Sequence, residues 1–489
     1  MKNNNMIAGC ICWASLVAAL TSCRKTEQQP NILFILADDQ RADALGCAGN
    51  NLISTPNIDK LSETGLRFTN SYIMGGHHGA ISAPSRAMLL SGRNLFSVYD
   101  KLEGVEIMPT YFSKFGYITF ATGKWHNEKS AFEAGFQQGK SIFLGGMADH
   151  FNIAVGDLDN DGKLSEPQKK GFSTDIFTEA AIGFLERYAT GDRKNPFFCY
   201  VAYTVPHDPY SPRPDYLDRY LPGSVPLPGN YMPLHPFAFD NLSVRDENLL
   251  PWPRPPESVK AVLADYYALI SHLDNNVGEI VQTLKDNNLY KNTIIVYSAD
   301  NGLAIGSHGL LGKQNLYEHS MKVPLIISGP GIPKGKRTDA LVYLIDLFPT
   351  LAELVSLPLP ENIDGISLLP AVQGKPDGGR SSIFTAYRNT IRAVRTKEWK
   401  LIRYPERDYS QLFNLMKDTL ELNNLAQDER YKSTIEDLWQ LMEDWQKTFG
   451  DTVSLTAKEL LPLEYDHEKL ERKPDMWQPE YTLKKYFGR

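Results

Sequence analysis

Short apolar runs alternate with amphipathic stretches along most of the chain. Residues 31–37 are largely apolar and stop at two aspartates, as in a buried parallel strand with polar side chains at its carboxyl end. Similar runs at 197–203, 293–298 and 323–328 predict further central strands. Apolar residues at helical spacing over 259–287 predict a long helix. We therefore expect an α/β fold, with a large mixed, mostly parallel sheet sandwiched by helices.

The pattern changes after a linker rich in Gly and Pro that begins at residue 374. Beyond it, four short strand-like runs and one helical pattern follow, at 383–387, 391–395, 399–404, 411–415 and 433–448. They predict a smaller C-terminal α+β subdomain, with a short antiparallel sheet and one helix, over residues 380–450. The catalytic domain is then expected at 31–374. Residues 451–489 show no periodicity and are predicted to form a wrapping tail.

The N-terminus resembles a targeting segment. Met1-Lys2 precedes an apolar run that ends near Leu20, which is short for a membrane span and typical of a signal peptide over residues 1–22. Leu20-Thr21-Ser22-Cys23 resembles a bacterial lipobox, which implies lipidation of Cys23 and a polar tether over 23–30. An ordinary signal peptide with a chance cysteine is the alternative. We expect a periplasmic or outer-membrane lipoprotein of a bacterial cell envelope, held at the membrane by its lipid anchor only.

Composition and charge narrow the function classes. The 489 residues are 42% hydrophobic and 22% charged, as in ordinary globular proteins, and are enough for a large core. The net charge of −7 argues against nucleic-acid binding, so any positive field must be local, as in a pocket for an anionic substrate. Cys10 and Cys12 would leave with the signal peptide and Cys23 would carry the lipid, so only Cys47 and Cys199 remain. Free thiols are the favoured interpretation, and a bridge between the two stays open.

Oxygen-bearing side chains follow two of the predicted strands. Asp38 and Asp39 come directly after the first, and Asp300 and Asn301 come after the strand at 293–298. Hard oxygen ligands suit Ca²⁺ or Mg²⁺ better than Zn²⁺, and adjacent carboxylates repel unless a cation lies between them. Helix capping and a turn are the competing structural explanation.

These pairs, with the segment Ser82-Ala83-Pro84-Ser85-Arg86, resemble the type I sulfatases of the alkaline phosphatase superfamily from about Asn31 to about Asp451. In that family the first residue of (Cys/Ser)-x-Pro-x-Arg is oxidised to formylglycine, or 3-oxoalanine. One oxygen of its hydrate binds the metal and the other attacks sulfur. The resemblance implies that Ser82 is modified and that one Ca²⁺ is bound by Asp38, Asp39, Asp300, Asn301 and the modified Ser82.

Serine is the minority type in this family, which mostly carries Cys. Ser-type precursors in the family need a radical-type maturase, so a formylglycine-generating maturase is an expected partner. A Cys→Ser replacement would give the same sequence, but the retained signal peptide favours an encoded Ser at position 82. The family match also assigns Arg86 to the oxyanion of the hydrate.

Three further motifs carry cationic residues. Gly123-Lys124-Trp125-His126 matches a family motif in which Lys124 binds sulfate and His126 contacts a formylglycine oxygen. Pro206-His207-Asp208-Pro209 matches one in which His207 contacts the sulfate and the bridging oxygen. Lys313 follows the Asp-Asn pair at the family's spacing and would bind sulfate. A histidine near neutrality suits protonation of the leaving alcohol; His207 is the first choice and His308, through substrate contact, the alternative.

Substrate contacts are less specified. His77 and His78 precede Ser82 and are predicted at the pocket rim, where they could contact a sugar. A plain surface loop is the alternative interpretation. Arg392 and Arg395 share one predicted strand and are expected to reach the sugar. A solvated strand face is the alternative interpretation. Residues 157–168 resemble an EF-hand loop, but Gln168 stands where a bidentate Glu is needed, which favours a polar turn over a second Ca²⁺ site.

The resulting prediction is a sulfuric ester hydrolase that removes O-sulfate from a carbohydrate, such as a galactose or N-acetylgalactosamine sulfate. One rival is a phosphodiesterase or phosphonate hydrolase of the same superfamily. The other is a non-catalytic glycan-binding lipoprotein, if Ser82 is not converted. The sugar, the sulfated position and the oligomeric state are not predicted.

Overall fold

The computed structural model describes residues 29–376 and 378–488. The predicted signal peptide, Cys23 and most of the tether therefore lie outside the described residues. Within the described ranges, no helix combines the length and the apolar character that crossing a bilayer requires.

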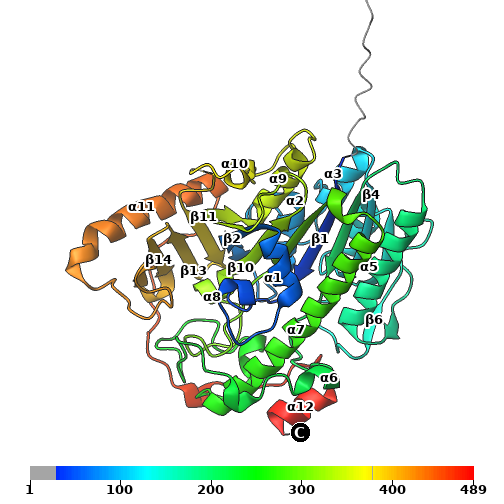
Figure 1. The fold of residues 1–489 in the computed structure, drawn as a ribbon. Helices are drawn as coiled ribbons and strands as arrows, with labels where there is room; N and C mark the ends of the chain where they lie inside the picture. The colour runs from blue at the N-terminus through cyan, green and yellow to red at the C-terminus, as the bar shows by residue number, and fades with distance from the viewer. Residues whose placement is uncertain (1–28, 377, 489) are drawn as a thin grey trace, which may run out of the picture.

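A mixed sheet of eight strands forms the centre of the molecule (Figure 1). In spatial order the strands are β11 (Lys336–Tyr343), β2 (Gly65–Tyr72), β10 (Lys322–Ser328), β9 (Thr293–Ala299), β1 (Asn31–Ala37), β8 (Phe197–Ala202), β4 (Ile118–Lys124) and β5 (Gln138–Phe143). The central strands β1, β8 and β9 are buried along their whole length, as their continuous apolar runs predict.

The run at 323–328 forms β10, a strand inside the sheet as predicted, which pairs antiparallel with both β9 and β2 and makes the sheet mixed. The other pairings of this sheet are parallel. β10 runs antiparallel to β9 because residues 300–321 stay at the carboxyl edge of the sheet and do not form the helical crossover that a parallel connection needs. The chain therefore re-enters the sheet from that edge.

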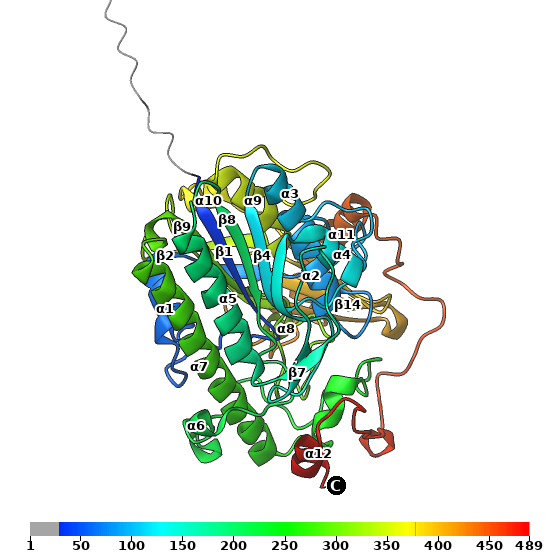
Figure 2. The ribbon, with the colours of Figure 1, turned by 90° about the vertical axis from the view of Figure 1, so that its right-hand side faces the viewer.

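Helices cover both faces of the large sheet (Figure 2). On one face lie α1 (Pro56–Glu63), α5 (Ser173–Thr190) and α7 (Pro256–Asp286); on the other lie α2 (Ser82–Ser91), α3 (Met108–Lys114) and α9 (Leu347–Leu354). Shorter helices are α4 (Lys129–Gly135), α6 (Pro214–Leu217), α8 (Glu318–Met321) and α10 (Leu369–Val372). The expected long helix is α7, and the α/β prediction is confirmed.

A second sheet has five strands in the order β15 (Tyr409–Asn414), β14 (Trp399–Tyr404), β13 (Ile391–Arg395), β12 (Ile383–Tyr387) and β3 (Gly75–Gly76). Helix α11 (Lys432–Phe449) packs on it. Its first four strands are the predicted antiparallel ones. The fifth, β3, comes from the segment before Ser82 and pairs parallel with β12, which ties the second sheet to the first.

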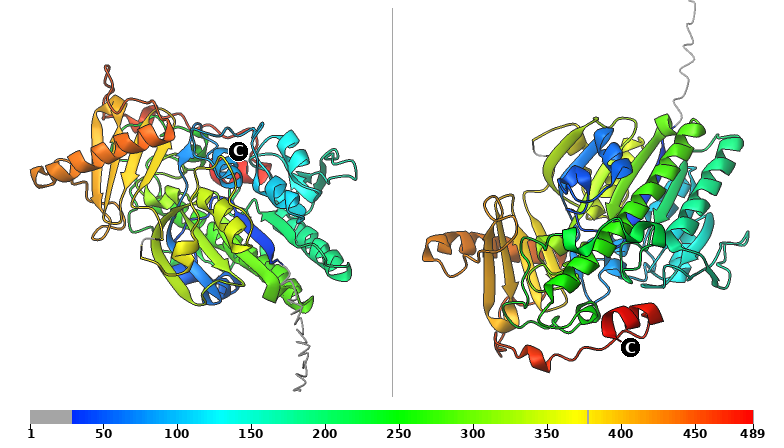
Figure 3. Two further views of the ribbon diagram at one scale, coloured as in Figure 1. Left: turned by 90° about the horizontal axis from the view of Figure 1, so that it is seen from above. Right: turned by 60° about the horizontal axis from the view of Figure 1, so that its bottom comes forward.

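The C-terminal tail is more regular than its sequence predicts. After α11 it runs beneath the molecule and ends in α12 (Glu480–Phe487), beside one end of α7 (Figure 3). An ion pair of Lys485 with Asp265 on α7 holds this end. A small hairpin of β6 (Ile153–Val155) and β7 (Gln168–Lys170) completes the strands.

Candidate active site

Two neighbouring strands of the large sheet deliver the four oxygen-bearing side chains to one place. Ala37 at the end of β1 is paired with Ala299 at the end of β9, so the residues that follow them are adjacent. The Asp39 amide donates to Asp300 Oδ1 at 3.1 Å, and Asn301 Nδ2 donates to Asp39 Oδ1 at 2.7 Å. Asp38 lies in the same buried group.

Ser82 is brought into this group by the first turn of α2. Its Oγ lies 3.2 Å from Asp38 Oδ1, 3.1 Å from Asn301 Oδ1 and 3.2 Å from Lys313 Nζ. The side chain is 1% exposed. The predicted nucleophile therefore contacts the predicted metal ligands directly, although Ser82 is more than 200 residues from Asn301 in sequence.

Three buried cations balance the three buried carboxylates. Lys124 Nζ lies 2.5 Å from Asp38, and Lys313 Nζ lies 2.5 Å from Asp39. Arg86 donates from Nε to Asp300 Oδ2 at 2.9 Å. Buried charges are tolerated when they are paired in this way.

The donor set fits a hard divalent cation. Carboxylate and amide oxygens are the ligands that Ca²⁺ and Mg²⁺ prefer. Burial, followed by the charge of Asp300, raises the pKa of Asp38 to about 6, so the crowded carboxylates would be stabilised by a cation between them. Because side-chain cations already balance the carboxylates, a divalent ion would leave a net positive site, which favours an anionic substrate.

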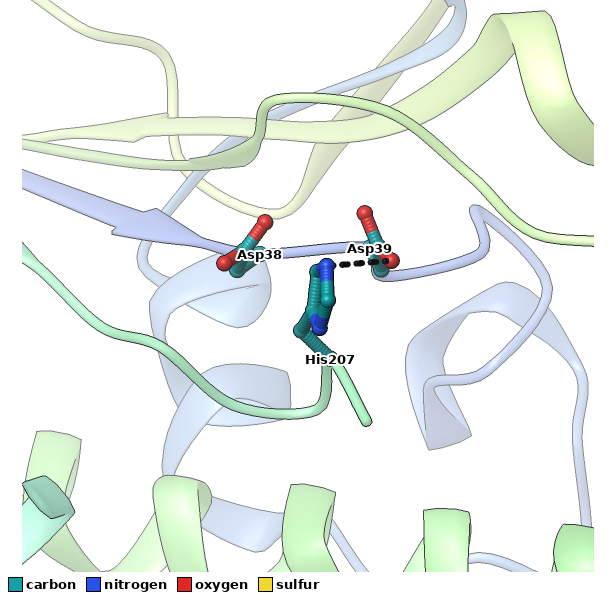
Figure 4. Close-up of side chains that lie close together, drawn as sticks. All are labelled: Asp38, Asp39 and His207. Carbon is teal, nitrogen blue, oxygen red and sulfur yellow. Dashed lines mark ion pairs between the residues drawn. The ribbon is translucent and has the colours of Figure 1, made fainter. Parts of the chain in front are cut away.

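His207 lies beside the same carboxylates (Figure 4). Its Nε2 is 3.7 Å from Asp39 Oδ2, and its Nδ1 is 2.7 Å from the carbonyl and 3.1 Å from the carboxylate of Asp208. Burial alone would lower the pKa of His207, but the charge of Asp39 and, less strongly, that of Asp208 outweigh it and raise this pKa. A protonated imidazole at this position can give a proton to a leaving group.

Two residues of the site have left-handed backbone conformations, and a glycine beside it has a positive φ. Asp39 and His126 have φ values of 61° and 63°, in the left-handed region that L-residues avoid. Gly123 has φ 97°, and a Cβ there would lie 1.8 Å from the Ala202 carbonyl, so only glycine allows β4 to approach β8 this closely. This explains the glycine that opens the motif of Lys124 and His126.

A cavity of about 770 Å³ opens over these residues. Such a volume is typical of a pocket for a small molecule. Its wall includes His126, His207, Lys313, Gln314, Arg388 and Trp477. Sequence reasoning found the first three and missed the others. Gln314 adjoins Lys313 and could have been noticed, whereas Arg388 lies in a short turn without a motif.

The C-terminal tail forms part of this wall. Asp475 pairs with Arg245 Nε at 2.7 Å, and Gln478 donates to Asp208 Oδ2 at 2.7 Å. Between them, Trp477 is 67% exposed and borders the cavity. The tail thus contacts the residue that follows His207, and no periodic signal in the sequence marks it.

The predicted substrate histidines do not border this cavity. His77 Nε2 lies 2.8 Å from the Leu95 carbonyl, and His78 Nε2 lies 2.5 Å from Asp100 Oδ2, so both face the neighbouring loop. His308 is buried, with its ring stacked on Tyr317 at 4.0 Å. The contacts of these three rings are with other parts of the protein, so the geometry indicates a structural role for them.

The two predicted substrate arginines are also occupied elsewhere. Arg392 is 1% exposed and donates to both carboxylate oxygens of Asp451, at 2.6 and 2.9 Å. Arg395 lies over the Tyr72 ring and 3.6 Å from Glu318. Neither borders the cavity, and each side chain is instead held by an acidic residue away from it.

Two smaller predictions concern metal and sulfur. Asp159 in the EF-hand-like stretch accepts from the amides of Asp161 and Lys163, which is the hydrogen bonding of a polar turn. Cys47 and Cys199, the cysteines within the described ranges, are both free.

The sequence pattern of the sulfatase family matches residues 30–357, about two thirds of the chain. The chain belongs to the sulfatase family. Residues 306–448 of this sulfatase also match the C-terminal region of N-sulphoglucosamine sulphohydrolase. The recognition made from Ser82 and its companion motifs is thereby confirmed.

Named relatives and solved structures agree with this assignment. This sulfatase is 28% identical to an N-acetylglucosamine-6-O-sulfatase of Bacteroides thetaiotaomicron, over 89% of this chain and 90% of the relative. It is 28% identical to an arylsulfatase of Clostridium perfringens, over 85% and 94%. A solved structure of a protein with its substrate D-glucosamine-2-N,6-O-disulfate superposes with a TM-score of 0.73 at 26% identity, over 87% of this chain and 99% of the other.

Proposed function

We propose that this sulfatase removes O-sulfate from a carbohydrate, with an oxidised Ser82 as nucleophile and one Ca²⁺ at Asp38, Asp39, Asp300 and Asn301. The convergence of Ser82 Oγ with two of these ligands and Lys313 carries the proposal. Ca²⁺ would supply positive charge and hold the nucleophile in its ionised form.

The chain's own residues divide the remaining work. Lys313 brings positive charge to the cavity wall, and Lys124 lies behind that wall and donates to the carbonyl of Gly146, a wall residue; a sulfate group would bind beside them. Arg86 is fixed by Asp300 and by the Lys124 carbonyl, and its buried Nη2 has no hydrogen-bond partner among the described residues. That nitrogen remains to orient the nucleophile. His207, with its raised pKa, would protonate the alcohol that leaves.

A carbohydrate substrate is favoured by the cavity wall and by the relatives. Trp477 offers an exposed aromatic face, and such rings bind the apolar face of a ligand while nearby polar groups fix its orientation. One relative is named an N-acetylglucosamine-6-O-sulfatase, and one solved structure holds a disulfated glucosamine. These observations favour a glucosamine sulfate over the galactose sulfates considered from sequence.

The nucleophile is tested by mass analysis of the peptide that contains residue 82. Protein produced with a formylglycine-generating maturase should show the loss of two hydrogens at Ser82 and should release sulfate from a panel of position-defined sulfated saccharides. Ser82→Ala should be inactive, whereas Ser91→Ala on the same helix should keep its activity. Unmodified Ser82 in fully active protein contradicts the proposal.

The phosphonate hydrolase alternative is tested with the same protein. A phosphonate monoester hydrolase of Agrobacterium radiobacter superposes with a TM-score of 0.70, but at 21% identity this reflects the fold alone. We expect sulfate esters to react faster than phosphodiesters or phosphonate monoesters. The opposite order of kcat/KM would favour the alternative.

We also propose that the protein is a lipoprotein of the bacterial envelope, with its lipid on Cys23. The support is the lipobox-like sequence Leu20-Thr21-Ser22-Cys23 after a short apolar run. Growth with an alkyne-tagged fatty acid should label the protein. Cys23→Ala should abolish the label and Cys47→Ala should not; equal labelling of both variants contradicts the anchor.

A further inference from the structure

One cation on the cavity wall has no anionic partner. Arg388 lies in the turn between β12 and β13, is exposed, and borders the cavity. Among the described residues its guanidinium makes no hydrogen bond or ion pair, and its Cζ lies 5.5 Å from the centroid of the Tyr387 ring. By contrast, Arg245 on the same wall is paired with Asp208, Asp246 and Asp475, and Lys313 with Asp39.

The backbone of Arg388 is held on both sides. Its amide donates to the Gly76 carbonyl at 2.8 Å, and its carbonyl accepts from Arg392 Nη1 at 2.7 Å. Arg392 is in turn fixed by its buried ion pair with Asp451. The predicted substrate residue Arg392 is therefore a positioning residue for Arg388, which, unlike Arg392, borders the cavity.

The conformation of this turn is one that a glycine would adopt more easily. Arg388 has φ 44°, in the left-handed region that residues with a Cβ rarely adopt. Strained positions of this kind cluster where a side chain has a task. The positive φ, the two backbone hydrogen bonds and the guanidinium without an anionic partner together indicate a side chain that is held in place for a ligand.

Arg388 also lies close to the sulfate-binding end of the cavity. Gly79 is its neighbour across the wall, since a Cβ built on that glycine would lie 3.9 Å from Arg388 Nη2. Gln314, which follows Lys313, donates to the Gly79 carbonyl at 2.8 Å. A ligand whose sulfate is held by Lys313 therefore needs to extend past only Gln314 and Gly79 to reach Arg388.

We propose that Arg388 binds a second anionic group on the saccharide whose ester sulfate faces Ser82. This inference rests on the proposed function and narrows its substrate class to saccharides with at least two anionic groups. The second group is an oxyanion, either another sulfate or the carboxylate of a uronic acid. The planar guanidinium can hold either one through two parallel hydrogen bonds.

The test compares Arg388→Gln with the parent enzyme on three saccharides. One carries a single sulfate and no other charge, one carries two sulfates, and one carries a single sulfate and a uronate. The measured quantity is the ratio of kcat/KM for each doubly charged saccharide to that for the singly charged one. We expect Arg388→Gln to lower this ratio by about 10- to 100-fold, mainly through KM, for the saccharide with the matching second anion.

Controls separate the outcomes. Arg388→Lys should restore part of the ratio, because it keeps the charge and loses the planar fork. Arg337→Gln removes an exposed arginine from β11, away from the cavity wall, and should leave every ratio unchanged. A ratio within about twofold of the parent enzyme for both doubly charged saccharides overturns the proposal. Failure of the parent enzyme to release sulfate from any saccharide would instead contradict the proposed function.

Discussion

Replacing Asp38 by Asn should uncouple the stability of the protein from calcium. Asp38, Asp39 and Asp300 are each at most 2% exposed, so they cannot gain stabilisation from solvent when a cation is withdrawn. At free calcium 100-fold above its Kd, binding stabilises the folded protein by about 2.7 kcal/mol. For a chain of this length, with an unfolding entropy of about 1 kcal/mol/K in total, the expected rise in Tm is about 3 °C.

The assay is thermal unfolding of protein stripped with a chelator, with and without calcium at a buffered free concentration. The parent protein should gain the full shift. Asp38→Asn, with a weaker and neutral ligand, should gain about 1 °C or less. Asp274→Asn is the matched control: it alters a buried aspartate on α7 that accepts from the Asn57 and Ile58 amides, and it should keep the full shift. An undiminished shift in Asp38→Asn would refute the assignment of this carboxylate as a ligand.

Three further outcomes follow from particular side chains. Asp274→Asn should lower the free energy of unfolding in urea by about 1–3 kcal/mol, because an NH₂ donor replaces one of the two oxygens that accept from amides at the start of α1; no change would contradict this capping role. Burial, with smaller effects of Lys400 and Arg41, lowers the pKa of His308 to about 4. Its contribution to stability is therefore present above pH 6.5 and is lost as the pH falls towards 4. The stability advantage of the parent over His308→Gln should shrink by about 2 kcal/mol between pH 7 and pH 5, and a constant difference would argue that the ring is not buried in its neutral form. Trp477→Ala should lower kcat/KM on sulfated saccharides by about two- to tenfold while Tm stays within about 1 °C, and unaltered kinetics would remove the ring from the binding surface.

The catalytic core could be predicted because its residues follow strands. Asp38 and Asp300 come after continuous apolar runs, and the carboxyl ends of parallel strands meet at one edge. Ser82, Lys124 and Lys313 could be added only through their family motifs, since nothing in the local pattern brings residues so distant in sequence together.

The substrate-facing residues could not be predicted, for a physical reason. Arg388 and Arg392 belong to one hairpin, and which of them meets the cavity depends on the pairing of β12 with β3 and on the partner offered by Asp451. Trp477 lies in a segment held by ion pairs and single hydrogen bonds, which leave no periodic trace. Such contacts form only in the assembled tertiary structure, so local sequence propensity cannot predict them.

The contacts of the C-terminal tail show what a protein truncated after α11 would lose. A chain that stops after α11 would retain every recognised motif, from Asp38 to Lys313, and therefore all the predicted catalytic residues. It would nevertheless lack Trp477 and Asp475, one of the three aspartates paired with Arg245, so one side of the cavity would be open to water.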